Sequence, residues 1–402
     1  MTVIHNKTID LFIELYIILI ATRNIFLFCG LSGVASALFI LVYIMQALTT
    51  VYAIALTVKR PIKANMYFFS SLIILLALVI IPLHYGAYIW TENSNLPISF
   101  LLTMLFVILT KKIVVSSRTI EICYTTSIIQ ALFALIISFW PSSFQNGILV
   151  LHMGNPNQTA IILWTIFSFC FLGWSKKKNS HRRSVGLWII MVGLLIQIYL
   201  TESRNIIFSF LIVIILYYWV KILKRNKEIP VIIQVVLLAS PIVIPVLVLS
   251  LMNILPTDIT FFGKLFFSGR ESIWNGIVTE FFSHPFAFHL NERPTSRYVL
   301  INGIASLKTM GAHNGILAIL WYYGIIVALL VLFIFLSRIK DIKRCASNNL
   351  NACITYIIVL ATIFSLSFEE GMIMGNVCTT MILPILFIIG QSEEYLESSS
   401  ER

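Results

Sequence analysis

Long apolar stretches alternate with short polar ones along almost the whole chain. A helix needs about 20 apolar residues to cross the roughly 30 Å hydrocarbon core of a bilayer. The pattern therefore predicts an all-α, polytopic integral membrane bundle of about 12 transmembrane helices, with residues 1–402 forming a single membrane domain. Two stretches, 97–110 and 376–390, are short for a crossing and would borrow flanking residues. The stretches lie at residues 9–28, 32–57, 67–83, 97–110, 119–139, 157–174, 185–200, 205–223, 231–253, 314–336, 353–368 and 376–390.

Composition excludes a soluble enzyme domain. Apolar residues make up 59% of the chain and charged residues 11%, and the mean hydropathy is +0.94. The six cysteines form no CxxC pair, so neither a disulfide framework nor a zinc site is indicated. No small-residue cleavage site follows the first apolar run, which we expect to remain as a span. The acidic, serine-rich segment 391–402 is expected to be a disordered cytoplasmic tail.

The positive charges predict the orientation. With the N-terminus in the cytoplasm, the strongly basic connections at 58–66, 111–118, 175–184, 224–230 and 337–352 all fall on the cytoplasmic side, as the positive-inside rule requires. The net charge of +11 thus reflects membrane topology and not nucleic-acid binding. Seven of the 28 Lys and Arg residues remain outside, where such residues are scarce and need a chemical reason: Arg23, Arg204, Lys264, Arg270, Arg293, Arg297 and Lys308.

Five of these seven lie in one long outer loop, 254–313. Ser268 and Glu271 have the spacing of a capping box, so a helix should start there. Apolar residues then recur at helical spacing up to His284-Pro285, which predicts an amphipathic helix at the outer interface. Its N-terminus and Arg270 together favour an anion such as a lipid-linked phosphate; the alternative is that Arg270 only reaches lipid headgroups. The apolar positions are Ile273, Trp274, Ile277, Val278, Phe281 and Phe282.

Two further outer positions carry candidate chemistry. Arg204 lies between two closely spaced spans, so its charge is held at the outer mouth of the bundle; the alternative is a structural ion pair with Glu202. His313 precedes the span that follows the long loop. Histidine can accept a proton from a hydroxyl near neutral pH, whereas arginine cannot. His313 is therefore a candidate general base, or else an ordinary polar cap.

Several polar residues on the same side are candidate contacts for substrate or acceptor hydroxyls. Amides and carboxylates bind sugars, but the segment from Asn155 to Asn157 also fits a turn and helix cap, and exposed carboxylates are often only solvated. The candidates are Asn157, Glu202, Arg297, Asn314 and Glu369.

The order of these motifs resembles the O-antigen ligase and polymerase superfamily of bacterial envelope glycan assembly. The resemblance covers residues about 150 to 370, while the first 140 residues match only in hydropathy. The chain departs from the family where Phe286-Ala287-Phe288-His289 follows His284-Pro285, because the family usually has a glycine-containing turn there. The matching segments are Gly154-Asn155-Pro156-Asn157-Gln158-Thr159-Ala160, Ser203-Arg204, Ser268-Gly269-Arg270 with Ile273-Trp274, His284-Pro285, Ala312-His313-Asn314 and Tyr323-Gly324-Ile325.

The resemblance implies a metal-independent, inverting glycosyltransferase without a cofactor in the bacterial cytoplasmic (inner) membrane, active on the outer face. Its donor would be a glycan on undecaprenyl diphosphate. By the matching positions, Arg204 and Arg270 would hold the diphosphate and His313 would act on the acceptor hydroxyl. The chemistry agrees, since two arginines can stabilise the departing diphosphate without a metal. No Asp-x-Asp motif points to a metal-bound nucleotide sugar.

The acceptor is left open. A polymerase would add the chain to the next lipid-linked repeat unit of an O-antigen, capsule or exopolysaccharide, and the compact loop favours this reading. A ligase would add it to lipid A core or another acceptor. The expected partners are the lipid-linked glycan, that acceptor, the bilayer and a chain-length regulator, with no nucleic acid. A flippase for the same glycans is a third hypothesis, but it would need a polar path through the bundle, and the candidate residues cluster at one face. Sugar identity, linkage and oligomeric state are not readable from the residues.

Overall fold

The computed structural model describes residues 4–58, 66–84, 95–176, 181–223, 229–251, 260–261, 264–265, 270–290, 294–301, 304–375 and 377–400. Helices dominate this part of the chain, and the strands form short antiparallel hairpins. The helices are α1 (Lys7–Phe28), α2 (Ser32–Val58), α3 (Met66–His84), α4 (Asn95–Leu109), α5 (Ser117–Ile137), α6 (Pro156–Lys176), α7 (His181–Leu200), α8 (Arg204–Leu223), α9 (Val231–Leu251), α10 (Arg270–Ser283), α11 (Gly315–Asn348), α12 (Leu350–Ser365), α13 (Gly371–Met374), α14 (Val377–Thr380) and α15 (Ile382–Ser400). The strands are β1 (Phe144–Gln145), β2 (Ile148–Leu149), β3 (Thr260–Phe261), β4 (Lys264–Leu265), β5 (Thr295–Ile301) and β6 (Ile304–Met310), and single 3₁₀ turns lie at η1 (Thr110–Lys112) and η2 (Pro141–Ser143).

The protein is a membrane-embedded, all-helical bundle. Among the described residues, eight helices are long and apolar enough to cross a bilayer: α1, α2, α3, α5, α6, α8, α9 and α11. Shorter apolar helices cover Val185–Leu200, Leu350–Ser365 and Cys378–Glu393. The predicted membrane class is therefore confirmed, and the expected number of about twelve spans stays a prediction.

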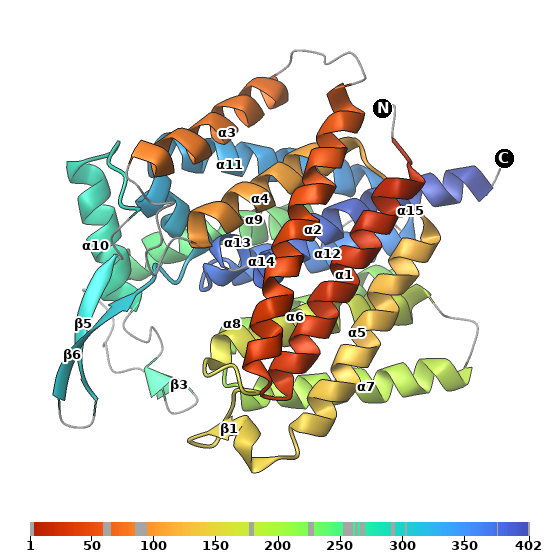
Figure 1. The fold of residues 1–402 in the computed structure, drawn as a ribbon, viewed down its shortest axis with the longest axis horizontal. Coiled ribbons are helices and arrows are strands. Elements are labelled where there is room, and N and C mark those ends of the chain that lie inside the picture. Colours follow the sequence, from red (N-terminus) through yellow and green to blue (C-terminus); the bar gives the residue numbers. More distant parts are fainter. Residues whose placement is uncertain are drawn as a thin grey trace.

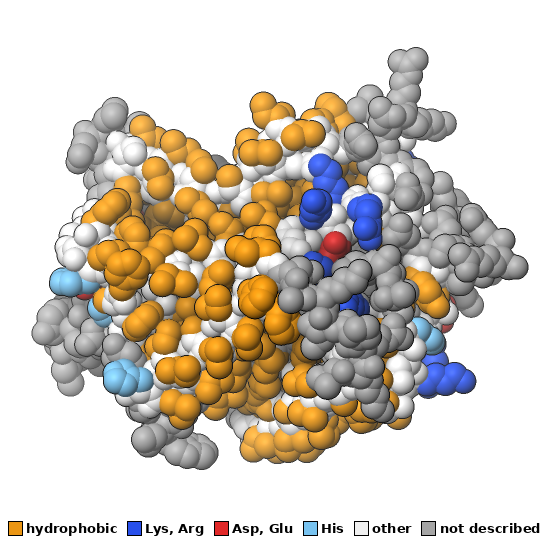
Figure 2. All heavy atoms as spheres, turned by 90° about the horizontal axis from the view of Figure 1, so that it is seen from above, with side chains coloured by type: hydrophobic (Ala, Val, Ile, Leu, Met, Phe, Trp, Pro, Cys, Tyr) orange, Lys and Arg blue, Asp and Glu red, His pale blue; other side chains and the backbone are white. Residues whose placement is uncertain are grey.

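The outer surface of the bundle is apolar where it would meet lipid. Large aliphatic side chains stand more than half exposed on several helices, which would aggregate in water but fits hydrocarbon. Figure 2 shows such side chains covering most of one face, with Lys and Arg side chains gathered toward one end of it. Examples, one from each of five helices, are Ile40, Ile80, Ile189, Ile215 and Ile232.

The core is centred on α12, which packs against α6, α8, α9, α11 and α15. Nearly every α12 side chain from Ala352 to Ile363 is buried. A helix that is apolar all round belongs inside a bundle. Its few polar groups are paired internally: the Thr362 hydroxyl accepts from Trp164 Nε1 of α6 at 3.1 Å. The C-terminal end of this central helix therefore has a fixed position.

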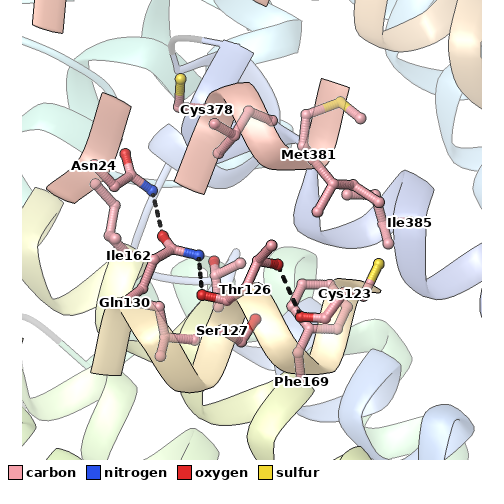
Figure 3. A pocket seen from close by; sticks show the side chains of 14 residues that line it. Asn24, Cys123, Thr126, Ser127, Gln130, Ile162, Phe169, Cys378, Met381 and Ile385 are labelled. Atoms are coloured by element: carbon pink, nitrogen blue, oxygen red, sulfur yellow. Dashed lines mark hydrogen bonds between the residues drawn. The ribbon is translucent and has the colours of Figure 1, made fainter. Parts of the chain in front are cut away.

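Polar side chains inside the bundle also connect helices far apart in sequence. In a pocket between α1, α5, α6 and the α14–α15 region, Asn24 Nδ2 donates to Gln130 Oε1 at 3.0 Å, and Gln130 Nε2 donates to the Thr126 carbonyl at 3.4 Å. Figure 3 shows Asn24 and Gln130 pointing toward each other across this pocket. Such paired amides hold membrane helices together by about 1 kcal/mol each.

The predicted span 376–390 is not one straight helix. It is divided between α14 and α15, with α13 just before it, and the carbonyl of Gly375, between α13 and α14, accepts from the Ser99 hydroxyl of α4 at 2.9 Å. The hydroxyls of Thr103 and Thr380 also meet, at 2.9 Å. Backbone groups released by a break in a membrane helix need such partners.

The long loop and the chain termini lie at opposite ends of the molecule. In Figure 1, α10 and the β5–β6 hairpin stand at one end, while the N and C labels lie at the other. This is the arrangement expected if both termini are cytoplasmic and the loop 254–313 is outside, although which end faces the cytoplasm stays a prediction.

Two predictions about the second half are wrong. Residues 337–352 are not a loop, because α11 continues to Asn348 and α12 starts at Leu350. The segment 391–402 is not disordered over its described part, because α15 runs to Ser400. Its first residues are buried by distant parts of the chain: the fully buried Arg338 donates to Gln391 Oε1, and the Ser392 hydroxyl accepts from the Val115 amide at 2.8 Å.

The long loop 254–313 contains a β-hairpin that the sequence analysis did not predict. Strands β5 and β6 pair over seven residues each, from Thr295↔Met310 to Ile301↔Ile304. The signal was present, because Asn302-Gly303 between two β-prone runs is a strong hairpin marker. Helix α10 covers the segment predicted to be amphipathic, with Ile273, Trp274 and Ile277 buried and Phe282 78% exposed, and its place at the outer interface stays a prediction. Ser268 lies outside the described residues, so the capping box stays a prediction.

Labelling a native cysteine tests the orientation. Cys29 follows α1 at its expected outer end and is exposed, whereas the other five cysteines are buried. We expect an impermeant maleimide added to intact cells to label Cys29. In a Cys29→Ser background, Lys343→Cys at the expected cytoplasmic end should react only after the membrane is opened. The reverse pattern would show that the bundle is inserted the other way round.

Candidate functional site

Four charged or titratable side chains from distant parts of the chain converge at the loop-bearing end of the bundle: Arg204, Arg270, His313 and Glu369. Arg270 Nη2 lies 3.6 Å from Glu369 Oε1. The charge of Arg270 acts on Arg204 and also on His313, so all three belong to one electrostatic site. The structure thus brings together the three residues that the sequence had linked to the diphosphate and the base.

Helix α10 places Arg270. Trp274, one turn later, is 1% exposed, and its Nε1 donates to the carbonyl of Ala312 at 2.9 Å. Because residues four apart share a helix face, this anchor turns Arg270 inward. The guanidinium then lies 5.7 Å from the centre of the Phe368 ring, a cation–π distance. The exposed fraction of the Arg270 side chain is 17%, so one part of it remains reachable.

The turn that carries His313 is held by Glu370. Glu370 Oε2 accepts from the Ala312 amide at 2.7 Å, and a side chain on Gly311 would overlap the Glu370 carboxylate. Since Ala312 is bonded on its other side to Trp274, α10 and this turn cannot move independently. His313 itself has φ of +50°, a conformation that costs energy for a non-glycine residue and persists where the surroundings hold it.

Asn314 starts α11 and is structural. It is fully buried; its Oδ1 accepts from the amides of Ile316 and Leu317, and its Nδ2 donates to the carbonyls of Pro241 and Ser367. The Pro241 carbonyl is free to accept because its ordinary helical donor would be residue 245, which is also a proline. The side chain of Asn314 thus serves as a helix cap and as a brace for α9, and its predicted contact with substrate stays a prediction.

Arg204 begins α8, and its neighbour Asn205 fixes that position. Ser203 Oγ donates to Asn205 Oδ1 at 2.7 Å, and Asn205 Nδ2 donates to Ser365 Oγ at the end of α12 at 3.4 Å. Asn205, next to Arg204, is thus bonded to the C-terminal end of α12, and Glu369 follows that same helix end in the chain. Arg204 and Glu369 are therefore both positioned by this end of the central helix. Glu202 is exposed, has φ of +53°, and acts electrostatically on Arg204, as the ion-pair alternative supposed.

Burial controls the protonation states here. Burial, more than the nearby Arg270 charge, lowers the pKa of His313 to about 4, so its imidazole is neutral at pH 7 and can accept a proton. Burial also raises the pKa of Glu369 to about 7; the attraction of Arg270 opposes this shift without cancelling it. The pKa of Arg270 is lowered, again mainly by burial. Burial therefore disfavours the charged form of both partners in the Arg270–Glu369 pair.

The other predicted contacts are less central. Asn157 is partly buried in the first turn of α6, where its amide donates to Asn155 Oδ1; this is the turn and cap alternative, and none of its described contacts joins it to Arg270 or His313. Arg297 lies in β5 opposite Lys308, and its side chain is outside the described part. Sequence reasoning missed the roles of Asn205, Phe368 and Glu370, because their partners lie 58 to 160 positions away.

No protein-family model matches this chain, and a search of curated proteins finds no similar sequence.

Proposed function

We propose that this protein is a metal-independent, inverting glycosyltransferase that uses a glycan on undecaprenyl diphosphate as donor, at the outer face of the bacterial cytoplasmic membrane. The observation that supports the proposal most is the cluster of two arginines and one neutral histidine at the end of the bundle that carries the long loop. The cluster provides an anion site and a proton acceptor side by side, on rigid elements.

Arg204 and Arg270 would bind the diphosphate. Two like charges in one partly buried site repel each other, and a ligand with two or more negative charges relieves that repulsion. On donor binding, the diphosphate would replace Glu369 as the partner of Arg270. The arginines would then stabilise the negative charge that develops on the leaving diphosphate.

His313 would act as the general base. The acceptor hydroxyl oxygen attacks the anomeric carbon, its proton passes to the free imidazole nitrogen, and the bond from that carbon to the diphosphate oxygen breaks. Undecaprenyl diphosphate leaves with the bonding electrons, and attack from the opposite side inverts the anomeric centre. A base needs to be unprotonated before the step, which the lowered pKa of His313 provides.

Among acceptors, the next lipid-linked repeat unit is favoured, which makes the protein a polymerase of O-antigen, capsule or exopolysaccharide. A ligase that uses lipid A core or another acceptor shares the same donor chemistry and is the second candidate. The flippase hypothesis is less favoured, because the charged cluster sits at one end of the bundle.

Reconstitution tests both the activity and the acceptor. Lipid-linked repeat units would be extracted from host cells in which the gene is deleted, and incubated with purified protein in liposomes. We expect a ladder of lengthened products, and we expect EDTA to leave it unchanged. Transfer only after a second acceptor is added would favour the ligase. Loss of activity on EDTA treatment, restored by Mg²⁺ or Mn²⁺, would refute the metal-independent mechanism, and absence of lipid-linked units from the outer leaflet of the deletion cells would favour the flippase.

A further inference from the structure

A second group of polar side chains lies at the other end of α10. A small pocket there, between the end of α10 and α11, is lined by Glu280, His284, His289 and Trp321 together with apolar residues such as Ile277 and Pro285. None of these four side chains takes part in the reaction described above. The pocket includes residues of the segment Phe286-Ala287-Phe288-His289, where the chain departs from the family pattern.

The polar groups of the pocket surround one carboxylate. Glu280 Oε1 lies 3.0 Å from His284 Nδ1 and 3.6 Å from His289 Nε2. The His289 ring stacks on the Trp321 indole with centres 4.1 Å apart and planes 20° from parallel. The exposed fraction is 67% for the His284 side chain and 36% for that of Glu280, so the pocket is open at the protein surface.

A break in α11 holds this arrangement in place. Gly324 has φ of +72° and interrupts the helix, so the Trp321 carbonyl loses its helical donor and accepts from the His289 amide at 3.2 Å instead. A side chain at position 324 would come within 3.1 Å of the Phe288 ring. The segment after α10 therefore docks into the break, and the glycine at this point of α11 makes the close approach possible.

The pocket and the anion site lie at the two ends of one helix. Positions 270, 274 and 277 follow the three-and-four spacing of one stripe of α10, and Trp274 and Ile277 bury this stripe in the bundle. Ten residues separate Arg270 from Glu280, which corresponds to about 15 Å along the axis. A ligand whose phosphate is held by Arg270 and which extends past this buried stripe by a few sugar units would span the distance to the pocket.

We infer that the pocket of Glu280, His284, His289 and Trp321 is a glycan subsite that binds a sugar of the lipid-linked substrate remote from the transferred bond. This inference rests on the proposed function and adds to it the residues that read the sugar. An aromatic ring beside a carboxylate and imidazole N–H groups offers an apolar platform and convergent hydrogen-bonding groups, the combination that orients small polar ligands in pockets. Glu280 and His284 bind hydroxyls, and Trp321 with His289 forms the wall against which the sugar packs.

Two variants with a matched control test the subsite. Glu280→Gln keeps the shape but removes the charge, and His284→Ala removes one exposed imidazole. A hydrogen bond to a charged group is worth enough that the KM for the lipid-linked repeat should rise about tenfold, while kcat stays within about twofold of the wild type. Asn275→Ala changes an exposed residue of α10 outside the stripe and should leave both constants unchanged.

A binding measurement separates the subsite from the activity. The free oligosaccharide, released from the lipid-linked repeat by mild acid, would be titrated into the wild-type protein by calorimetry. We expect binding that Glu280→Gln weakens about tenfold and that Arg270→Lys leaves intact, because the free sugar has no diphosphate. Unchanged KM and unchanged binding in both pocket variants would overturn the subsite while leaving the transferase proposal standing. If the variants instead lose binding to anionic phospholipid vesicles and not to the sugar, the pocket is a lipid headgroup contact. Failure of the wild-type protein to extend any lipid-linked unit would refute the proposed function itself.

Discussion

Replacing His313 with alanine is expected to lower the transfer rate by about 10²–10⁴-fold, the usual contribution of a general base. The donor should still bind, since Arg204 and Arg270 remain. His313→Asn is the better probe of chemistry, because asparagine tolerates the positive φ of +50° at this position and so preserves the turn, yet cannot accept the proton. Single-turnover rates and donor affinity, measured on the same reconstituted protein, separate the two effects.

The pH dependence of kcat is a second test of His313 as the general base. Burial and Arg270 hold the pKa of His313 near 4, so the fraction of neutral imidazole is close to one from pH 8 down to about 5. The kcat at saturating donor should therefore be flat over that interval and fall only as the pH approaches 4. A descending limb near pH 6.5 would show that His313 is solvated like a free histidine. Near-normal turnover in His313→Asn would assign the proton to water or to Glu369.

Arg270→Lys is expected to cost about 10²-fold in kcat/KM while leaving membrane insertion and folding intact. A guanidinium can bond two phosphate oxygens at once, and that of Arg270 also lies 5.7 Å from the centre of the Phe368 ring, whereas an ammonium is a single point charge. Loss of one preorganised donor to a developing anion has this order of effect. Arg204→Lys should behave in the same way, and both variants should be measured for kcat/KM with the lipid-linked repeat.

The matched control for both variants is Arg118→Lys. Arg118 lies at the start of α5, its side chain is 79% exposed, and it pairs with Glu14 of α1. This exchange should change kcat/KM by no more than experimental error. Wild-type turnover in Arg270→Lys and Arg204→Lys would show that these arginines serve only topology or packing.

The Arg270–Glu369 pair also has a role in the proposed mechanism. A guanidinium without any partner at 17% exposure would be costly, and Glu369 Oε1 lies 3.6 Å from it. If Arg270 binds the diphosphate as proposed, the pKa of Glu369, raised to about 7, would let this carboxyl take up a proton, so that no buried charge would be left unpaired.

The amino-acid sequence determined the local features of this protein. Runs of apolar residues long enough to cross a bilayer form helices with little dependence on their neighbours, because hydrocarbon provides no other partner for backbone groups. The apolar spacing after Arg270 likewise predicted α10, and Arg204, Arg270 and His313 were found because charged or titratable groups at the outer ends of spans are unusual and therefore conspicuous.

Only the tertiary structure decided which groups meet. Asn314 was predicted as a sugar contact, and only the packing of α9 supplied the Pro241 carbonyl to which its amide donates. Glu370 had no role in the sequence analysis, because its partner, the Ala312 amide, lies 58 positions away. The segment 391–402 resembled a free tail, yet Gln391 is bonded to Arg338 of α11 and Ser392 is buried against the residues preceding α5. In each case a local pattern specifies what a polar group can bond to, but its partner comes from a helix packed beside it, and packing depends on the whole bundle.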